Sequence, residues 1–269
     1  MRALKRTILI LLAVLVAAYI GTRIILGSST RNEAPTISCP QGVLEVSAKD
    51  DETVLLTGVT AHDSQDGDLT DQVIIGGISK LISKDTAKVT LMVFDSDHNM
   101  GKVVRYIRYT DYQRPQFTIT KPLVFSSAKE ASLLDRLKAT DVVDGDISSQ
   151  IRVSTLADTD NSQVKNISVQ VTNSMGDTAW LQLPVLIQET NPLRPVIDLS
   201  NYLVYLEVGD SFDPAAYLSG LTVAGVAMET TDVTVKSDVD TTQIGTYRVE
   251  YSYSSDGFTG LAILTVAVQ

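Results

Sequence analysis

The amino-acid sequence predicts an all-β chain, with three tandem two-sheet β-sandwiches preceded by one N-terminal transmembrane helix. Three observations support this prediction: an apolar run near the N-terminus, a sequence repeat of domain size, and apolar residues that alternate with polar ones inside each repeat. Such alternation is typical of strands with one buried side and one side in water.

The first predicted element is a membrane anchor, residues 1–31, made of a basic tip and a span. Residues 7–26 carry one charge, Arg23, and 20 residues of helix cover about 30 Å, the thickness of a bilayer core. Three basic residues precede this run, which favours a cytoplasmic N-terminus. We therefore expect a single-pass plasma-membrane protein with residues 32–269 extracytoplasmic. The alternative is a cleaved signal peptide with its apolar region over residues 7–20.

Charge and composition exclude several classes of function. All 32 acidic residues but only 17 of the 22 basic residues follow residue 31, so that part carries a net charge of −15. Nucleic acid is excluded as a partner because phosphate binding needs a basic stripe, and membrane contact is expected only through residues 7–26. The single cysteine, Cys39, rules out an intrachain disulfide framework and leaves an intermolecular disulfide open. Two histidines, His62 and His98, form no recognisable catalytic constellation, so no enzyme is expected.

A repeat divides the rest of the chain. Ala61–Val73 recurs as Ala139–Ile151 at an offset of 78, with Ala, three Asp, Gly and Gln identical. Prolines that open a predicted strand recur at one constant spacing: Pro35, Pro115 and Pro195. Together these marks predict three modules with the bounds 34–113, 114–193 and 194–269.

Within each module the period of the apolar residues is 2, as in a strand. In the third module Val249 and Tyr251 alternate with Arg248 and Glu250. A module of this length with about seven strands fits an immunoglobulin-like sandwich. Tyr247, which follows Gly-Thr, is predicted to form a tyrosine corner. Short linkers that contain proline predict a semi-rigid rod.

Specific motifs extend this interpretation to a family. Asp-x-x-Asp-Gly-Asp-[Leu/Ile]-[Thr/Ser] occurs at 63–70 and 141–148, VGDxxxP at 208–214, and VDTxxxGTY at 239–247. This set resembles the bacterial immunoglobulin-like modules of group 3, which include the Ig-like domains of pesticidal crystal proteins. The resemblance implies an exported bacterial surface protein whose modules act as spacers or adhesive units. The third module departs from the pattern because it lacks Asp-Gly-Asp, and the first two lack Gly-Thr-Tyr.

The acidic turns are the candidate metal sites, with calcium as the one cofactor considered. Their carboxylates are oxygen ligands of the kind that Ca²⁺ takes. They belong to these residues: Asp63, Asp66, Asp68, Asp141, Asp144 and Asp146. The alternative is turn chemistry, in which Asp accepts backbone N–H bonds and Gly67 and Gly145 supply a positive φ. Asp95–Asn99 also resembles a calcium loop, but Met100 stands where that loop needs Gly, so a hairpin turn is expected there.

Tyrosines mark a candidate contact surface in the last module, which holds six of the ten in the chain. Tyr247, Tyr251 and Tyr253 share the predicted inward side, so they belong to the core. The remaining three are the candidate binding residues: Tyr202, Tyr205 and Tyr217.

The expected function is that of a non-catalytic, membrane-anchored cell-surface protein. Its Ig-like modules are expected to act as spacers, as adhesive units that bind a protein or glycan surface partner, or as both. The alternatives are a calcium-stiffened structural rod and a subunit of an envelope protein complex.

Overall fold

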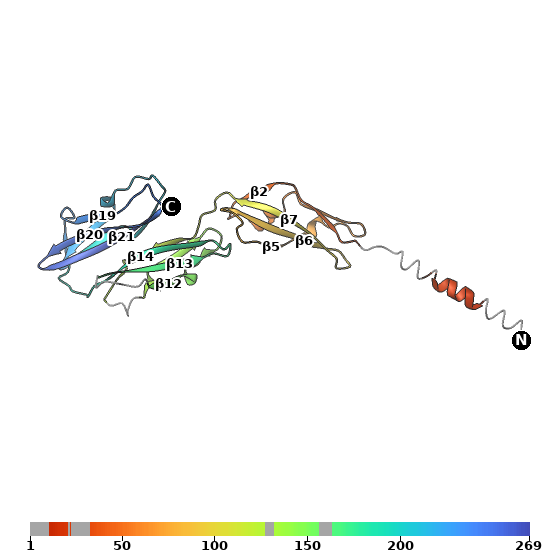
Figure 1. Ribbon diagram of the computed structural model, residues 1–269, viewed down its shortest axis with the longest axis horizontal. Coiled ribbons are helices and arrows are strands. Elements are labelled where there is room, and N and C mark those ends of the chain that lie inside the picture. The colour runs from red at the N-terminus through yellow and green to blue at the C-terminus, as the bar shows by residue number, and fades with distance from the viewer. Residues whose placement is uncertain (1–10, 21, 23–32, 127–131, 156–162) are drawn as a thin grey trace. The chain divides into compact units, whose positions relative to one another are not determined.

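The structure is a computed structural model that describes residues 11–20, 22, 33–126, 132–155 and 163–269 (Figure 1). The described residues after 33 form strands, turns and short 3-10 helices, so the prediction of an all-β fold is confirmed. The chain divides into two compact units. Unit 1 comprises Met1–Val46 and Asp50–Tyr109, and unit 2 comprises Ser47–Lys49 and Thr110–Gln269.

The predicted membrane anchor is not found. The described helical residues at the N-terminus are 11–20 and 22. No described helix is long and apolar enough to cross a membrane. The prediction of a single-pass plasma-membrane protein, anchored by residues 7–26 with residues 32–269 outside, is therefore wrong on this finding; positions 7–10, 21 and 23–26 lie outside the described residues.

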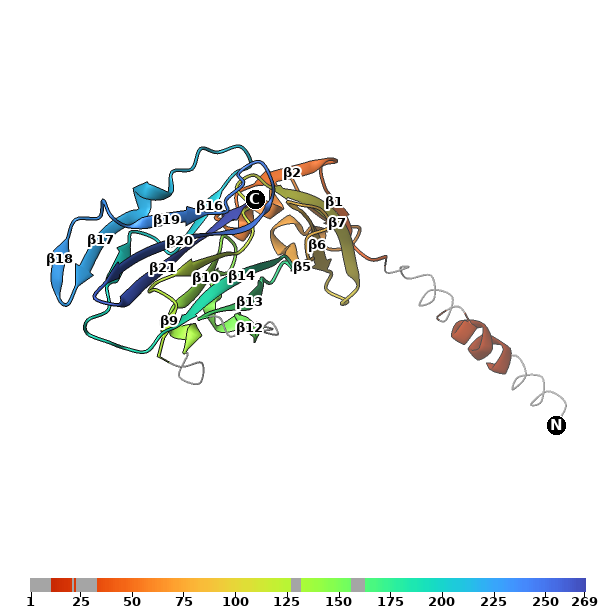
Figure 2. The ribbon, with the colours of Figure 1, turned by 60° about the vertical axis from the view of Figure 1, so that its left-hand side comes forward.

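Unit 1 is a sandwich of two sheets (Figure 2). The smaller sheet has the order β1-β3-β4, with these bounds: β1 Thr36–Ser38, β3 Thr60–Asp63 and β4 Gly67–Asp68. The larger has the order β2-β7-β6-β5, with these bounds: β2 Val43–Val46, β7 Met100–Tyr109, β6 Thr86–Phe94 and β5 Ile74–Ile78. The 3-10 helices are η1 (Glu52–Leu56) and η2 (Thr70–Gln72).

The core of unit 1 lies between these sheets because alternate residues of the long strands point inward. These inward residues are fully buried: Ala87, Val89, Leu91, Val93 and Ile107. The period of 2 in the sequence therefore sets which side of the sheet is covered.

The described residues of unit 2 form four sheets. The sheet of order β11-β10-β8 has these bounds: β11 Gly145–Asp146, β10 Leu137–Asp141 and β8 Gln116–Ile119. The sheet of order β12-β13-β14-β9 has these: β12 Arg152–Thr155, β13 Val164–Thr172, β14 Thr178–Ile187 and β9 Val124–Phe125. The sheet of order β15-β17-β18 has these: β15 Val196–Leu199, β17 Leu218–Val223 and β18 Val226–Met228.

The fourth sheet of unit 2 has the order β16-β21-β20-β19, with these bounds: β16 Leu203–Leu206, β21 Phe258–Val268, β20 Gly245–Ser255 and β19 Thr234–Ser237. The 3-10 helices of unit 2 are η3 (Leu133–Asp135), η4 (Ser148–Gln150) and η5 (Pro214–Tyr217). Each four-stranded sheet of the molecule contains one short strand that pairs in parallel with its long neighbour.

The sequence repeat at an offset of 78 is also a repeat of strand register. Met92 pairs with Lys102 between β6 and β7, and Gln170 pairs with Trp180 between β13 and β14. We call the strands β1–β7 the first repeat and β8–β14 the second repeat. Each position in the long hairpin of one repeat therefore has a defined equivalent in the other.

We call the sheets β15-β17-β18 and β16-β21-β20-β19 the last sandwich. Two structural tyrosines of the last sandwich lie as predicted. The Tyr247 hydroxyl donates to the carbonyl of Gln243 at 3.1 Å, which confirms the tyrosine corner. Tyr251 is fully buried and its hydroxyl donates to the carbonyl of Pro214 at 2.6 Å.

Within unit 2 the last sandwich packs against the second repeat. Leu203 and Ala267 belong to the same cluster of buried apolar residues as Phe117. The backbone N–H of Phe117 donates to the Tyr205 hydroxyl at 2.8 Å, and burial raises the pKa of that hydroxyl to about 12. The predicted linker between these sandwiches is therefore supplemented by direct packing.

Candidate functional site

The acidic turns are closed by hydrogen bonds from their own backbone. Oδ1 of Asp63 accepts from the N–H groups of Gln65 (2.7 Å) and Asp66 (3.0 Å). In the second repeat, Oδ1 of Asp141 accepts in the same way from Val143 (2.9 Å) and Asp144 (3.0 Å). These are Asx turns, whose side-chain oxygen replaces a backbone acceptor.

The middle aspartate of each turn reaches the other sheet of its sandwich. The Asp66 carboxylate accepts from the N–H (2.6 Å) and the hydroxyl (2.9 Å) of Ser96, at the tip of the β6–β7 hairpin. Asp144 accepts from the N–H and the hydroxyl of Ser174, both at 2.6 Å. Each turn is thus fastened to the hairpin of the opposite sheet.

The last aspartate of each turn accepts a hydrogen bond from the first residue of the short 3-10 helix that follows. Asp68 accepts from the N–H of Thr70 and Asp146 from the N–H of Ser148, both at 2.9 Å. Hydrogen bonds from these residues lower the pKa of the two carboxyl groups, and bonds from Asp66 and Gln65 lower the pKa of Asp63. Among the described residues, no three side chains of the His, Cys, Asp and Glu types are grouped to hold a metal ion. Calcium binding at these turns stays a prediction.

The three candidate tyrosines are all partly buried inside unit 2. Tyr205 bonds Phe117, as described above, and Tyr202 lies with its hydroxyl 3.5 Å from the N–H of Leu199. Tyr217 stacks on Phe212 with ring centroids 5.6 Å apart. The structure thus brings Tyr202 and Tyr205 to the packing region between the two sandwiches of unit 2, whereas Tyr217 lies in η5.

The other singled-out residues lie in ordinary structural settings. Asp95 accepts from the N–H of Asn99 at 2.7 Å, and Asp95–Asn99 forms the β6–β7 hairpin turn as expected. His98 in that turn has a φ of 70°, and His62 lies on β3. Cys39 is a free, half-buried thiol.

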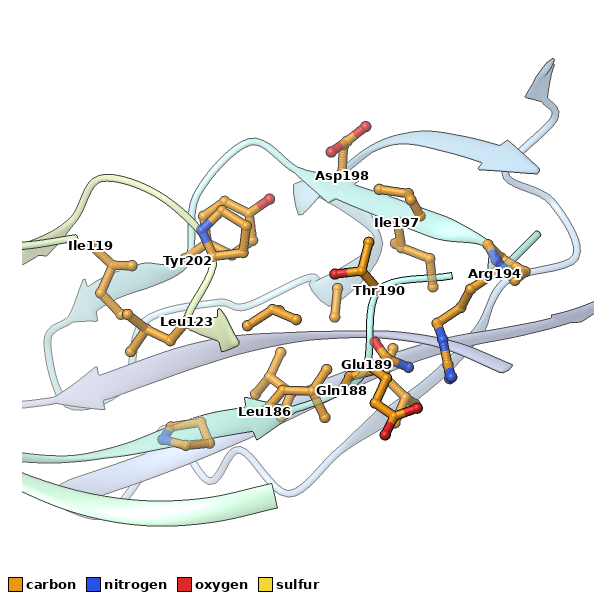
Figure 3. A pocket seen from close by; sticks show the side chains of 18 of the residues that line it. Ile119, Leu123, Leu186, Gln188, Glu189, Thr190, Arg194, Ile197, Asp198 and Tyr202 are labelled. Carbon is orange, nitrogen blue, oxygen red and sulfur yellow. The ribbon is translucent and has the colours of Figure 1, made fainter. Parts of the chain in front are cut away.

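A cavity of about 250 Å³ opens in unit 2 between the second repeat and the last sandwich (Figure 3). Leu123 and Leu186 line it from the second repeat. Ile197 of β15 and Ile263 of β21 line it from the last sandwich. The segment between β14 and β15 supplies the polar end of the cavity, where Figure 3 shows Gln188, Glu189 and Arg194 close together.

Arg194 is fixed at this polar end. Its Nη1 donates to the carbonyl of Thr259 at 3.0 Å, and the side-chain amide of Gln188 donates to the same oxygen at 3.2 Å. Its guanidinium lies 6.0 Å from the ring centroid of Phe258. The Nε atom is buried and has no acceptor. Within the described part of the chain Arg194 forms no ion pair, although Glu189 and Asp198 also line the cavity.

Unit 1 carries an exposed apolar surface on the outer side of its larger sheet. Seven outward side chains form it, and we call them the apolar face: Val43, Ile74, Met92, Phe94, Met100, Val104 and Tyr106. Six of them are between 42% and 49% exposed, and Met92 is partly buried. Cross-strand pairs join them into one patch, since Ile74 pairs with Met92 and Phe94 pairs with Met100.

The charges on this side of the sheet are mainly positive. Outward positions of β2, β6 and β7 hold Lys88, Lys102 and Arg108 against one acid, Glu45. Arg108 is paired with Glu45 at 3.8 Å and with Asp85, just before β6, at 4.0 Å, so among the described residues the unpaired positive charges on this side are those of Lys88 and Lys102. Lys88 lies 5.6 Å from the ring centroid of Tyr106. The apolar face thus has a basic character in a chain that is acidic as a whole.

The second repeat has a polar surface at the equivalent positions. At the offset of 78, Met92, Phe94, Met100 and Val104 are replaced by these residues: Gln170, Thr172, Thr178 and Gln182. One aromatic residue, Trp180, stands where the first repeat has Lys102. The same fold in the same register therefore does not need apolar side chains at these four positions.

Sequence reasoning missed both the apolar face and the cavity. The sequence does contain a signal for the apolar face. In the strand whose inward residues are Val89, Leu91 and Val93, the alternating outward positions, where polar residues are expected, hold Met92 and Phe94. The cavity has no comparable signal, since its walls come from segments of both sandwiches that are far apart in the sequence.

No protein-family model matches the chain, and no curated protein sequence matches it. Among solved structures, the chain is similar to the CBM51-2 and INT domains of Clostridium perfringens ZmpB, a structure in complex with GlcNAc (20% identity over 55% of this chain and 26% of that one, TM-score 0.24). It is also similar to Drosophila N-cadherin EC1-4 (12%, 88% and 76%, TM-score 0.23) and human CDH23 EC21-23 (11%, 87% and 100%, TM-score 0.22).

The chain spans 26% and 30% of the lengths of the two ZmpB structures. Because no family model matches, the resemblance to bacterial Ig-like modules of group 3 stays a prediction, as does the presence of three copies. The two-sheet sandwich that the resemblance implied is observed in the sheets themselves.

Proposed function

We propose that the protein is a non-catalytic binding protein whose β-sandwiches carry contact surfaces, and that the apolar face of unit 1 binds a protein partner. One observation supports this above the others: the first repeat exposes apolar side chains where the second repeat, with the same strand register, has polar ones. Contiguous exposed apolar patches on soluble domains mark interaction sites.

The charges around the apolar face define the chemistry of the partner. Lys88 and Lys102 lie among the apolar side chains, so the matching surface would carry apolar residues flanked by carboxylates. A second copy of the same face would bring these lysines against each other, which disfavours a symmetric dimer. Tyr106 and Phe94 supply aromatic area of the kind that dominates binding energy at protein interfaces.

A swap between the repeats tests this proposal. The variant Met92→Gln/Phe94→Thr/Val104→Gln gives unit 1 the residues that the second repeat carries, so it is expected to fold. Chemical cross-linking in the cells that produce the protein should give a discrete adduct with the wild type, and the swap should remove it. A matched control, Gln170→Ala/Gln182→Ala, should keep the adduct. An adduct of equal yield in the swap variant, or none with the wild type, would overturn the proposal.

A further inference from the structure

We propose that the cavity of unit 2 binds a small amphipathic carboxylate, with its apolar body between the two sandwiches and its carboxylate on Arg194. This site lies in unit 2 and does not rest on the contact surface proposed for unit 1.

The walls of the cavity determine the apolar part of the ligand. Leu123, Leu186, Ile197 and Ile263 line the cavity, and Figure 3 shows the first three of them around it. An apolar cavity of about 150 Å³ is large enough for one benzene ring. At about 250 Å³ the present cavity accommodates a ring with a substituent or a short aliphatic chain. A polyhydroxylated ligand would leave its hydroxyl groups unpaired against these walls.

Arg194 determines the charged part. A buried N–H without an acceptor is costly, and Nε of Arg194 is such a group. The bond from Nη1 to Thr259 holds the guanidinium in place, so an incoming carboxylate meets Nη2 already oriented, while Nε stays buried. Glu189 and Asp198 also line the cavity, but both are exposed, where water screens their charge.

The direct test is binding of hexanoate and benzoate to the full chain, measured by calorimetry and by amide chemical shifts. Both acids should bind, and the amides near Leu123, Leu186 and Ile263 should shift. Hexanamide, which has the same body without the charge, should bind about tenfold more weakly, because it loses one charge-assisted hydrogen bond. No binding of either acid at concentrations up to about 10 mM, or shifts elsewhere in the chain, would overturn the proposal.

Variants assign the two parts of the ligand to their contacts. Arg194→Met should make hexanoate and hexanamide bind equally, and Ile263→Asn, which puts a polar group into the apolar wall, should weaken both. The matched control is Arg114→Met, because Arg114 also directly precedes a strand-opening proline but pairs with Asp177 at 3.3 Å. Arg114→Met should bind as the wild type does. A preference for the acid that survives in Arg194→Met would overturn the role of Arg194. If either variant fails to fold, the shift map of the wild type still decides the location.

Discussion

The carboxylate of Asp66 accepts two hydrogen bonds from Ser96, 30 residues away, one from its N–H and one from its hydroxyl. Asp144 and Ser174 form the same arrangement in the second repeat. Each pair joins the turn after one strand of the smaller sheet to the hairpin tip of the larger sheet. The acidic motif that resembles a metal loop in the sequence therefore links the two sheets of a sandwich through a hydrogen-bonded Asp–Ser pair.

Breaking the Asp144–Ser174 hydrogen bonds should destabilise the second repeat. Asp144→Asn loses the charge that both Ser174 donors use, and we expect the free energy of unfolding to fall by about 1–2 kcal/mol. Trp180, the single tryptophan, lies in the same sandwich, so its fluorescence during urea unfolding reports the change. Asp232→Asn, at an exposed position, is the matched control. A double-mutant cycle with Ser174→Ala should show coupling between the two changes. Additive effects would contradict a stabilising interaction between Asp144 and Ser174.

Acid should weaken both repeats. Hydrogen bonds hold the pKa values of Asp63, Asp68 and Asp146 below 3.8, so the unfolded chain takes up protons before the folded chain does. The stability that these groups contribute is present above that value and is lost as the pH falls below it. Melting temperatures between pH 6 and pH 2.5 should therefore drop mainly below about 4, and Asp146→Asn should make the drop shallower. An unchanged pH dependence in that variant would contradict this.

Alkali should weaken the packing inside unit 2. Burial raises the pKa of Tyr205 to about 12, above its ordinary value of 10.0. As the pH rises from 10 to 12 the unfolded chain releases this proton while the folded chain keeps it, so stability falls across that window. Tyr205→Phe should flatten this part of the curve at a cost of about 1 kcal/mol at neutral pH, from the lost bond to Phe117. Tyr251, whose pKa is also raised to about 12, continues to contribute in that variant.

Calcium should leave the melting temperature unchanged. The carboxylates of the two turns already accept backbone and serine hydrogen bonds, so the turns are held in place without an ion. Thermal unfolding in millimolar CaCl₂ and in EDTA should therefore coincide. A rise in calcium that disappears in Asp66→Asn/Asp144→Asn would contradict this prediction and support the calcium-stiffened rod.

Local patterns predicted the parts of the fold that depend on neighbouring residues. The alternation around Tyr251, the Tyr247 corner and the Asx turn at Asp63 each follow from a few adjacent side chains. The docking of Tyr205 on Phe117 joins residues 88 positions apart, and no local pattern reports such packing. The anchor was predicted from hydropathy over residues 7–26, whereas no described helix is long and apolar enough to cross a membrane.

The most direct test of the contact surface compares two equivalent positions in the two repeats. A photo-reactive amino acid is placed at Val104 in one variant and at Gln182 in another, and each is irradiated in the cells that produce the protein. These positions have the same place in strand register, but one lies in the apolar face and the other on the polar surface of the second repeat.

We expect a discrete cross-linked species at position 104 that weakens at high salt and with Lys88→Gln/Lys102→Gln, because the lysines select an acidic partner. Position 182 should give little or no such species. Equal cross-linking at the two positions, or none at position 104, would contradict the assignment of the apolar face as a protein-binding surface.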